Sequence, residues 1–438
     1  MKKLQIKTVV RCILAFFIAL GVLVTALVGT TAIPNEAIYD NMVESALVYK
    51  TRDRYDFDET KQLRRITDNY ADNILLNVLW NMKSDTPFRS AFDTAYYDGE
   101  EDGLNRGLYS TITEGSEPNV DYTRYWHGMV VVIRPLMLIF NITQIKWIGL
   151  GTAVLLLVAN VALLCRKKQY FAMAALVLSY LGVHFWWMVK SAEYQPAILL
   201  SLLFSLLFVL LEKKGESALL CLAVMSGVCI AFFDFLTTET LTILIPLALV
   251  FLIRQQEERL GTWKDNLPFL VKSMVAWGGA YAFTFVAKWS LATLVLRENK
   301  FVTAFSSAAE RIGGTEGADN LPLYQQMPFA VLGNISTLFG GLARVDFHNI
   351  VLGLLVTTVV FGSLWYLFRG NYRKDITILM LLLGLVPYLR YLVLNNHSYL
   401  HEFFTYRAQA VTILALLSVL WYNTDKSLLI RKKKRRRK

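Results

Sequence analysis

Long runs of apolar residues separated by short polar connections dominate the hydrophobic pattern of this chain. Ten runs approach the length of about 20 residues that a helix needs to cross a bilayer. They cover roughly residues 9–31, 143–165, 169–189, 193–211, 217–235, 237–253, 267–291, 348–368, 376–394 and 408–423. The runs lack the period-2 alternation of barrel strands, and only helices or closed barrels satisfy the backbone in lipid. The pattern predicts an all-α, polytopic transmembrane helical bundle of about ten spans.

The polar residues gather in two longer segments, which divide the chain. The predicted order is a first span (1–32), an outer segment (33–142), spans two to seven (143–296), a second outer segment (297–347), spans eight to ten (348–424) and a basic tail (425–438). Residues 33–128 alone carry 18 acidic and 10 basic side chains. Long segments of this kind are often functional, although a simple spacer would have a similar composition. We expect the protein to work on this side of the membrane.

Basic residues fall at every second connection of the predicted bundle. They are Lys2, Lys3, Lys7 and Arg11 at the first span, Arg166, Lys167 and Lys168 after the second, Lys213 and Lys214 after the fourth, Arg254 and Arg259 after the sixth, Arg369, Arg373 and Lys374 after the eighth, and the run from Arg431 to Lys438. Cytoplasmic loops are enriched in Lys and Arg. The pattern predicts a multi-pass protein of the cell (plasma) membrane with both termini in the cytoplasm and its active face extracytoplasmic.

Composition narrows the class further. Hydrophobic residues make up 55% of the 438 residues and charged residues only 18%, below the roughly 25% charged of soluble proteins. The net charge of +11 is mainly a topology signal, and the basic tail suits anionic membrane lipids better than nucleic acid. The first run could pass for a cleavable signal peptide, but its length favours a retained anchor. The cysteines, Cys12, Cys165, Cys221 and Cys229, lie within or at the end of spans, so they predict no disulfides in the outer segments.

The first outer segment contains a helical pattern with two acids. From Glu59 to Met82, apolar residues recur at helical spacing, which predicts an amphipathic helix along the membrane surface. Asp68 and Asp72 lie four residues apart and away from the apolar stripe. Such a pair could act as a general base with a charged neighbour. A solvated helix face, paired with Arg64 and Arg65, fits the same spacing.

The same segment ends in an aromatic motif and a cation among apolar residues. Tyr125-Trp126-His127-Gly128 is followed by an apolar run that Arg134-Pro135 and Asn141 interrupt. We expect a short interfacial helix near 129–140 before the next span, because Pro breaks a helix. Aromatic residues are common at membrane interfaces, but an ionisable residue at the depth of Arg134 is a functional candidate.

Further polar residues lie at the predicted outer ends of spans. Lys190 and Glu193 join spans three and four, and Asp234 lies in the short connection between spans five and six. The last outer connection carries Arg390, His397, His401 and Arg407, which predict donors for an anion, especially a phosphate. His397 and His401 could also form a zinc pair, although no HExxH pattern accompanies them. Mutual pairing at the interface is the structural alternative.

The whole chain resembles the GT-C superfamily, the multi-pass membrane glycosyltransferases that use polyprenyl-phosphate-linked sugars. The similarity is in the long acidic first outer loop, the interfacial helices and the number of spans. Three patches are similar to uncharacterised bacterial members: residues 125–128 with Arg134-Pro135, residues 233–237, and residues 397–407. The match of architecture covers essentially the full length.

The resemblance implies a function and a distribution of roles. It implies transfer of a sugar from a polyprenyl-phosphate donor to an extracytoplasmic glycan or lipid-linked acceptor, within cell-envelope polysaccharide biosynthesis. The implied catalytic acids are Asp68 and Asp72, with Asp40, Asp56 and Asp58 as competitors. The implied substrate- and phosphate-binding residues are His127, Arg134, Asp234, Arg390, His397, His401 and Arg407. No cofactor is required, although a divalent metal remains open. The alternatives are a polymerase, ligase or non-catalytic component of polysaccharide assembly and export, or a transporter.

Overall fold

The fold of the chain is almost entirely helical. The structure, a computed structural model, describes residues 2–99, 104–313, 321–342, 347–368 and 373–424. Within these residues the strands are two antiparallel pairs, β1 (Tyr55–Asp56) with β2 (Thr67–Asp68), and β3 (Ala95–Tyr96) with β4 (Val120–Asp121). The predicted all-α class is confirmed. The basic tail 425–438, Arg369 and the glycine-rich residues Gly314–Gly317 lie outside the described residues.

Among the described residues, seven helical segments are long and apolar enough to cross a membrane. They are Ile6–Thr31 in α1 (Lys2–Thr31), α7 (Ile142–Arg166), Ala192–Lys214 around α9 (Gln195–Leu211), α10 (Glu216–Phe233), α12 (Trp263–Leu296), α16 (Lys374–Val393), and Glu402–Asn423, which contains α18 (Glu402–Thr405) and α19 (Ala410–Asn423). Three shorter apolar helices are α8 (Tyr170–Gly182), α11 (Leu241–Gln256) and Ile350–Tyr366 within α15 (Phe347–Phe368). Together they fall on the ten predicted runs. A helical membrane protein is confirmed, and ten spans stay a prediction.

The third predicted span is shorter than its apolar run. Helix α8 ends at Gly182, and His184 has a left-handed backbone with φ 54°. A left-handed backbone conformation ends the α-helix, because the right-handed helix needs a negative φ at each residue. The chain goes on as the short 3₁₀ helices η2 (Phe185–Lys190) and η3 (Ala192–Tyr194).

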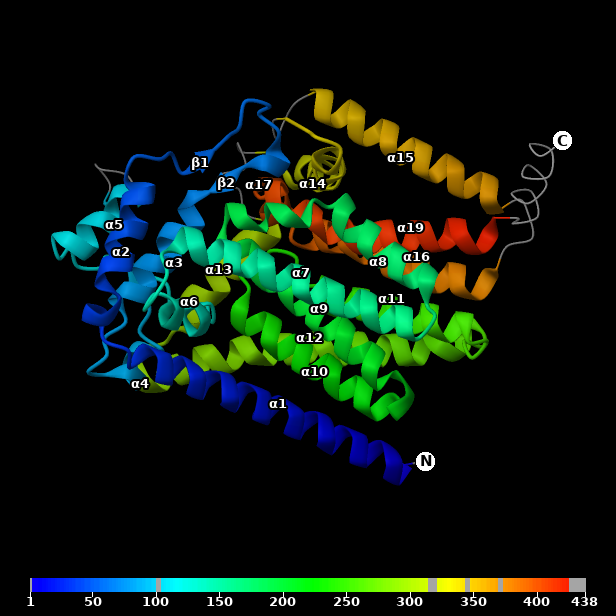
Figure 1. The fold of residues 1–438 in the computed structure, drawn as a ribbon, viewed down its shortest axis with the longest axis horizontal. Coiled ribbons are helices and arrows are strands. Elements are labelled where there is room, and N and C mark those ends of the chain that lie inside the picture. Colours follow the sequence, from blue (N-terminus) through cyan, green and yellow to red (C-terminus); the bar gives the residue numbers. More distant parts are fainter. Residues whose placement is uncertain (1, 100–103, 314–320, 343–346, 369–372, 425–438) are drawn as a thin grey trace.

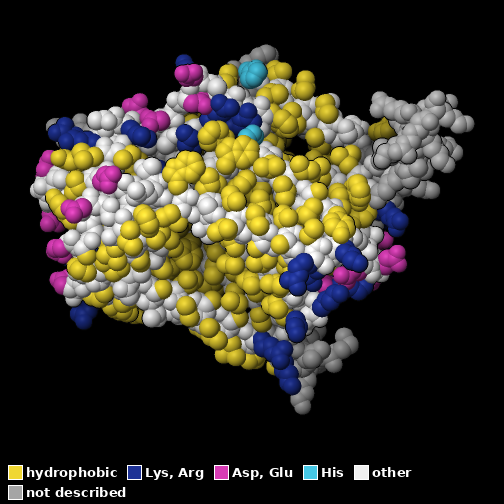
Figure 2. Space-filling view, in the orientation of Figure 1, with side chains coloured by type: hydrophobic (Ala, Val, Ile, Leu, Met, Phe, Trp, Pro, Cys, Tyr) yellow, Lys and Arg dark blue, Asp and Glu magenta, His cyan; other side chains and the backbone are white. Residues whose placement is uncertain are grey.

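The connections that the sequence marks as basic meet at one end of the bundle. Arg254 and Arg259 both bind Glu212, at 3.3 and 2.9 Å. The Gln256 side-chain amide donates to the carbonyl of Lys168 at 2.8 Å. The first residues of α1 and the last of α19 lie at this end too (Figure 1). Figure 2 shows Lys and Arg side chains concentrated there, and acidic side chains at the opposite end. The alternating direction of the helices therefore agrees with the charge pattern.

The first outer segment forms a layer of short helices at the other end of the bundle (Figure 1). It contains α2 (Asn35–Lys50), η1 (Leu63–Arg65), α3 (Asn69–Asn81), α4 (Pro87–Ser90), α5 (Leu104–Thr113) and α6 (Val130–Leu136). Helix α6 confirms the short helix expected near 129–140. Asn141 then begins α7 through a capping box with Gln144, which explains why one overlong helix does not form.

The helix predicted from Glu59 to Met82 is wrong in extent and exposure. Helix α3 begins only at Asn69, because Thr67 and Asp68 pair with β1. Asp68 is its N-cap and accepts a hydrogen bond from the backbone N–H of Ala71 at 2.9 Å. Both faces of α3 are buried, including Asp72, because α3 packs against α2, α5 and α6 of the same layer and against η3.

The aromatic motif at residues 125–128 attaches the outer layer to the bundle. The Trp126 indole N–H donates to the carbonyl of Thr284 in α12 at 2.9 Å. The backbone N–H of Gly128 donates to the carbonyl of Phe232 at 3.0 Å. A Cβ at Gly128 would lie 2.4 Å from that oxygen, so only glycine permits this approach.

The remaining elements close the outer end of the bundle. They are α13 (Phe301–Gly313) and α14 (Leu323–Leu338) in the second outer segment, and α17 (Asn395–Leu400) and η5 (Tyr406–Gln409) in the last connection; η4 (Glu212–Lys214) lies at the opposite end. Helix α14 packs against α15, α17 and α18. This packing brings residues from both outer segments and the last connection close to one another.

Candidate functional site

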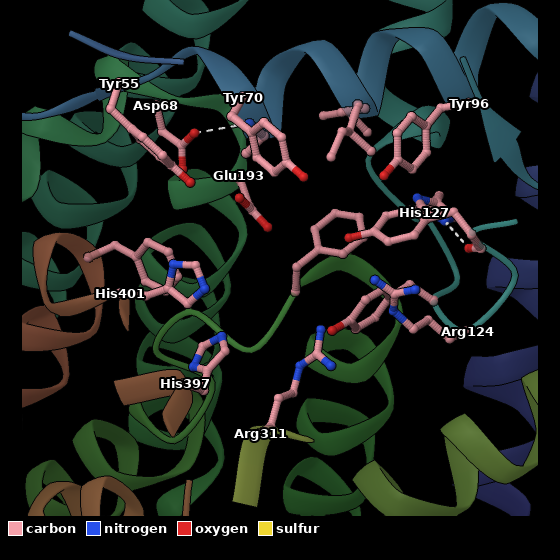
Figure 3. Close-up of a pocket in the computed structure, with 17 residues that line it drawn as sticks. Tyr55, Asp68, Tyr70, Tyr96, Arg124, His127, Glu193, Arg311, His397 and His401 are labelled. Carbon is pink, nitrogen blue, oxygen red and sulfur yellow. Dashed lines mark hydrogen bonds between the residues drawn. The ribbon is translucent and has the colours of Figure 1, made fainter. Parts of the chain in front are cut away.

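A cavity lies where the outer layer meets the bundle. Together with the part open to solvent, its empty space is about 850 Å³. The cavity is lined by Tyr55, Asp68, Tyr70, Ala71, Ile74, Leu75, Tyr96, Tyr122, Arg124, Tyr125, His127, Glu193, Phe235, Arg311, His397, His401 and Phe404. These residues come from parts of the chain that are far apart in the sequence. Their polar groups converge on one space (Figure 3).

Two carboxylates form one side of the cavity. Asp68 projects from the start of α3, and Glu193 projects from η3 below it (Figure 3). Burial, and secondarily the neighbouring Asp72, raises the pKa of Asp68 to about 7. A carboxyl group that titrates near neutral pH can take up or release a proton during a reaction. Asp68 therefore has the properties of a general base.

Two arginines reach into the cavity from other sides (Figure 3). The Arg124 guanidinium lies over the ring of Tyr122 at 4.2 Å. Arg311 on α13 donates from Nη1 to the carbonyl of Ser307 at 2.7 Å and lies 5.6 Å from the ring of Tyr125. Within the described part of the chain neither arginine forms a salt bridge with a carboxylate. Both retain N–H groups that can bind an anion.

The three histidines of the cavity add further polar groups. His127 Nε2 bonds to the carbonyl of Tyr122 at 2.8 Å. Burial, with the nearby cations Lys288 and Arg124, lowers the pKa of His127 to about 3. The rings of His397 and His401 lie 4.7 Å apart, and burial followed by His401 lowers the pKa of His397. His127 and His397 are therefore neutral at physiological pH and act as hydrogen-bonding groups.

Asp72, the second predicted catalytic acid, is not part of the cavity lining. Its carboxylate is fully buried and accepts from Lys146 Nζ at 2.8 Å, the Tyr49 hydroxyl at 2.8 Å, and the Ser191 hydroxyl and Ala192 N–H at 2.8 and 2.7 Å. With four donors around it, Asp72 has a positioning role. Of the competing acids, Asp40, Asp56 and Asp58 also lie outside the lining.

Two of the predicted phosphate-binding arginines, Arg134 and Arg390, are occupied by internal contacts. Arg134 donates to the carbonyls of Ile33 and Leu79 and to Asn35. Arg390 pairs with Glu239 at 2.7 Å. These contacts match the structural alternative of mutual pairing, because a buried cation needs partners.

Arg407 and Asp234 also lie outside the cavity lining. Arg407 is 2% exposed and lies between the rings of Tyr194 and Tyr406, at 4.8 and 4.9 Å. Asp234 accepts from the backbone N–H of Thr237 at 2.8 Å. Of the predicted site residues, Asp68, His127, His397 and His401 come together in the cavity.

The cations of the cavity were missed as binding residues. Arg124 lies directly before the aromatic motif, three residues before His127, and Glu193 lies in the connection between the third and fourth predicted spans. Arg311 could have been found because α13 is an amphipathic helix in an outer segment. Only the packing of α13 reveals that its basic residue faces the first outer segment.

The residues present do not form a recognisable metal site. Among the described residues no group of three or more His, Cys, Asp or Glu side chains is placed to hold a metal ion. We therefore derive no step through a metal.

Fold and cavity define a helical membrane protein with a polar, partly buried site at one end of its bundle. Comparison of the chain with protein families, with curated proteins and with solved structures finds no match. The functional argument therefore rests on the chemistry of the cavity.

Proposed function

We propose that the protein is an integral membrane glycosyltransferase that transfers a sugar from a polyprenyl-phosphate donor to an extracytoplasmic glycan or lipid-linked acceptor. The observation that carries the proposal is the arrangement of the cavity, in which Asp68 and Glu193 face the same space as Arg124 and Arg311. Sugar transfer from a lipid phosphate needs a base for the acceptor hydroxyl and cations for the leaving phosphate.

The residues have complementary roles in the proposed reaction. Asp68 takes the proton of the acceptor hydroxyl as its oxygen forms a bond to the anomeric carbon. The bond between that carbon and the phosphate oxygen breaks, and Arg124 and Arg311 bind the departing lipid phosphate. Fixed cations at the position of developing charge are often the largest contribution to catalysis. Glu193 accepts hydrogen bonds from sugar hydroxyls.

The charge distribution supports an extracytoplasmic cavity. The basic connections gather at the end of the bundle away from the outer layer (Figure 2), and Lys and Arg are enriched in cytoplasmic loops. This orientation gives a cytoplasmic N-terminus and an active face exposed to donors and acceptors in the outer leaflet of the cell membrane. A lipid donor also needs no nucleotide-binding motif.

The location of the ionisable groups disfavours a transporter. Transporter sites are typically near the midplane of the bilayer, whereas Asp68, Arg124 and Arg311 belong to the outer segments. A non-catalytic assembly component would bind a lipid-linked glycan without consuming it. Measuring turnover of the donor therefore distinguishes such a component from a glycosyltransferase.

The test is sugar transfer by the purified chain in proteoliposomes supplied with a panel of radiolabelled polyprenyl-phosphate sugars. Asp68→Asn should lower transfer roughly 10²- to 10⁴-fold. Asp85→Asn is the matched control, because Asp85 is exposed in the same segment, and it should keep wild-type activity. If no donor of a broad panel is consumed by the wild type, the glycosyltransferase proposal is wrong.

A further inference from the structure

Outside the cavity, cations and aromatic rings gather where η1 meets η2. The group, here called the basic–aromatic shelf, consists of Arg64, Arg65, His184, Trp187 and Lys190. None of these residues lines the cavity. Figure 2 shows Lys and Arg side chains gathered beside a histidine on the upper part of the molecule, bordered by hydrophobic side chains and by a few acidic ones.

Trp187 lies between two of the cations. Arg65 Cζ is 5.7 Å and Lys190 Nζ is 5.5 Å from the centre of its ring. Its indole N–H has no hydrogen-bond partner in the described part of the protein, and neither has Arg65 Nε. Donors of three chemical kinds, guanidinium, ammonium and indole, are therefore close together.

Arg64 extends the shelf towards His184. Its Nη1 lies 3.2 Å from His184 Nε2, and its Nε donates to Gln62 Oε1 at 2.8 Å. Burial, followed by Arg64, Arg407 and Arg65, lowers the pKa of His184 to about 4. Three guanidinium groups thus act on one neutral imidazole.

In the described part of the chain, carboxylates balance the positive charge of the shelf only in part. Of its three cations, Arg65 pairs with Asp58 at 3.0 Å. Over the described residues, Arg64 and Lys190 have no carboxylate within salt-bridge distance. An aromatic belt at a membrane interface explains a single Trp beside a cation. Three clustered cations with one counter-charge repel one another, and a bound anion would relieve this repulsion.

The neighbouring surface indicates the source of the anion. Helix α8 ends two residues before η2 and exposes Leu178 and Leu181 to 50% and 41%. Exposed apolar side chains on the helix that leads into the shelf suit a molecule with a phosphate head and an acyl tail.

We propose that the basic–aromatic shelf is a second phosphate site, which binds the headgroup of an anionic phospholipid. Arginine matches phosphate through its planar fork of N–H groups, and Lys190 supplies a further donor. The site is separate from the cavity, so it is independent of the proposed sugar transfer.

The test counts lipids retained by the full chain, purified in detergent and supplied with phosphatidylglycerol or phosphatidylcholine, by native mass spectrometry. Wild type should retain phosphatidylglycerol in preference to phosphatidylcholine. The double variant Arg65→Gln/Lys190→Gln should bind phosphatidylglycerol at least about tenfold more weakly than wild type, because it loses charge-assisted hydrogen bonds. Lys83→Gln/Arg89→Gln removes the same charge from exposed positions of the first outer segment and should bind like wild type.

Two results would overturn the proposal. One is equal retention of the two lipids, and the other is unchanged binding by Arg65→Gln/Lys190→Gln. Inorganic phosphate serves as the competing probe for a site that takes free phosphate. Failure of phosphate to displace the lipid supports a lipid site, whereas displacement at comparable concentration overturns the lipid assignment.

Discussion

Asp72 of α3 and Lys146 of α7 form a buried ion pair, with Oδ2 and Nζ 2.8 Å apart and side-chain exposures of 0% and 9%. Asp72 also accepts from Ser191 and Ala192, the residues directly before Glu193. Asp68 lies one helical turn before Asp72. Asp72 therefore fixes Asp68 and Glu193, the two cavity carboxylates, relative to each other.

Breaking this pair should destabilise the protein strongly. Asp72→Asn leaves Lys146 buried without a counter-charge, and we expect a loss of about 3–5 kcal/mol in the free energy of unfolding. Unfolding in mixed detergent micelles measures it. The double variant Asp72→Asn/Lys146→Met should lose less than the sum of the single variants. Lys272→Met is the control, because its pair with Glu216 is half-exposed and should contribute less than about 1 kcal/mol. Equal effects of Lys272→Met and Asp72→Asn would contradict the buried pair.

The rate of sugar transfer should depend on the protonation of Asp68. Its pKa is raised from 3.8 to about 7 in the folded chain, and only the carboxylate can act as a base. The rate should therefore rise as pH increases through about 7 and then level off. Initial rates between pH 5 and 9, a range chosen to bracket that value, test this. A rate that falls as pH rises through 7 would exclude the base role.

The raised pKa of Asp68 also predicts how the free energy of unfolding changes with pH. Asp68 binds its proton more tightly in the folded chain than in the unfolded chain. Its stabilising contribution to the free energy of unfolding is therefore complete below about pH 4. It is lost as pH rises towards 7. In Asp68→Asn this part of the pH dependence should disappear, which unfolding of both proteins at several pH values will reveal.

Arg390 and Arg124 should fail in different ways when substituted. Arg390→Gln breaks the buried pair with Glu239, so lost activity should accompany lost folded protein. Arg124→Gln removes a cavity cation without breaking a salt bridge, so the folded yield should stay near that of wild type while transfer falls. Size-exclusion chromatography and transfer assays on both variants separate the two effects. Well-folded but inactive Arg390→Gln would show that Arg390 belongs to the reaction.

Oxidation should link α1 to α10. The sulfur atoms of Cys12 and Cys221 are 4.0 Å apart, and a small movement brings them to the roughly 2 Å of a disulfide. A membrane-permeant oxidant should protect both from alkylation, detected by mass spectrometry of peptides, while the exposed Cys165 stays reactive. Full alkylation of Cys12 and Cys221 after oxidation would contradict the packing of α1.

Local patterns were enough to predict much of the fold. Apolar runs located the helices because each span must satisfy its own backbone in lipid, and Pro135 with Asn141 marked the separation of α6 from α7. The start of α3 was not predicted, because Thr67 and Asp68 pair with Tyr55 and Asp56 in two-residue strands that are too short to show an alternating pattern.

The site was only partly predictable for a related reason. Asp68 was found through its segment and spacing, but Asp72 has the same spacing and a different role, which only Lys146 and Ser191 determine. Arg134 and Arg390 were candidates because each lies in or at the end of an apolar stretch of the sequence, where an unpaired charge would be costly. Their partners Ile33 and Glu239 lie 101 and 151 residues away, beyond the reach of a local pattern.

The central claim, that Asp68 and the two cavity arginines act on one lipid-phosphate sugar, is tested most directly by measuring donor binding and donor consumption on the same protein samples. Asp68→Asn should bind the polyprenyl-phosphate sugar as wild type does and fail to consume it. Arg124→Gln/Arg311→Gln should lose both binding and consumption. Wild-type consumption by Asp68→Asn, or undiminished binding by the arginine double variant, would contradict the account.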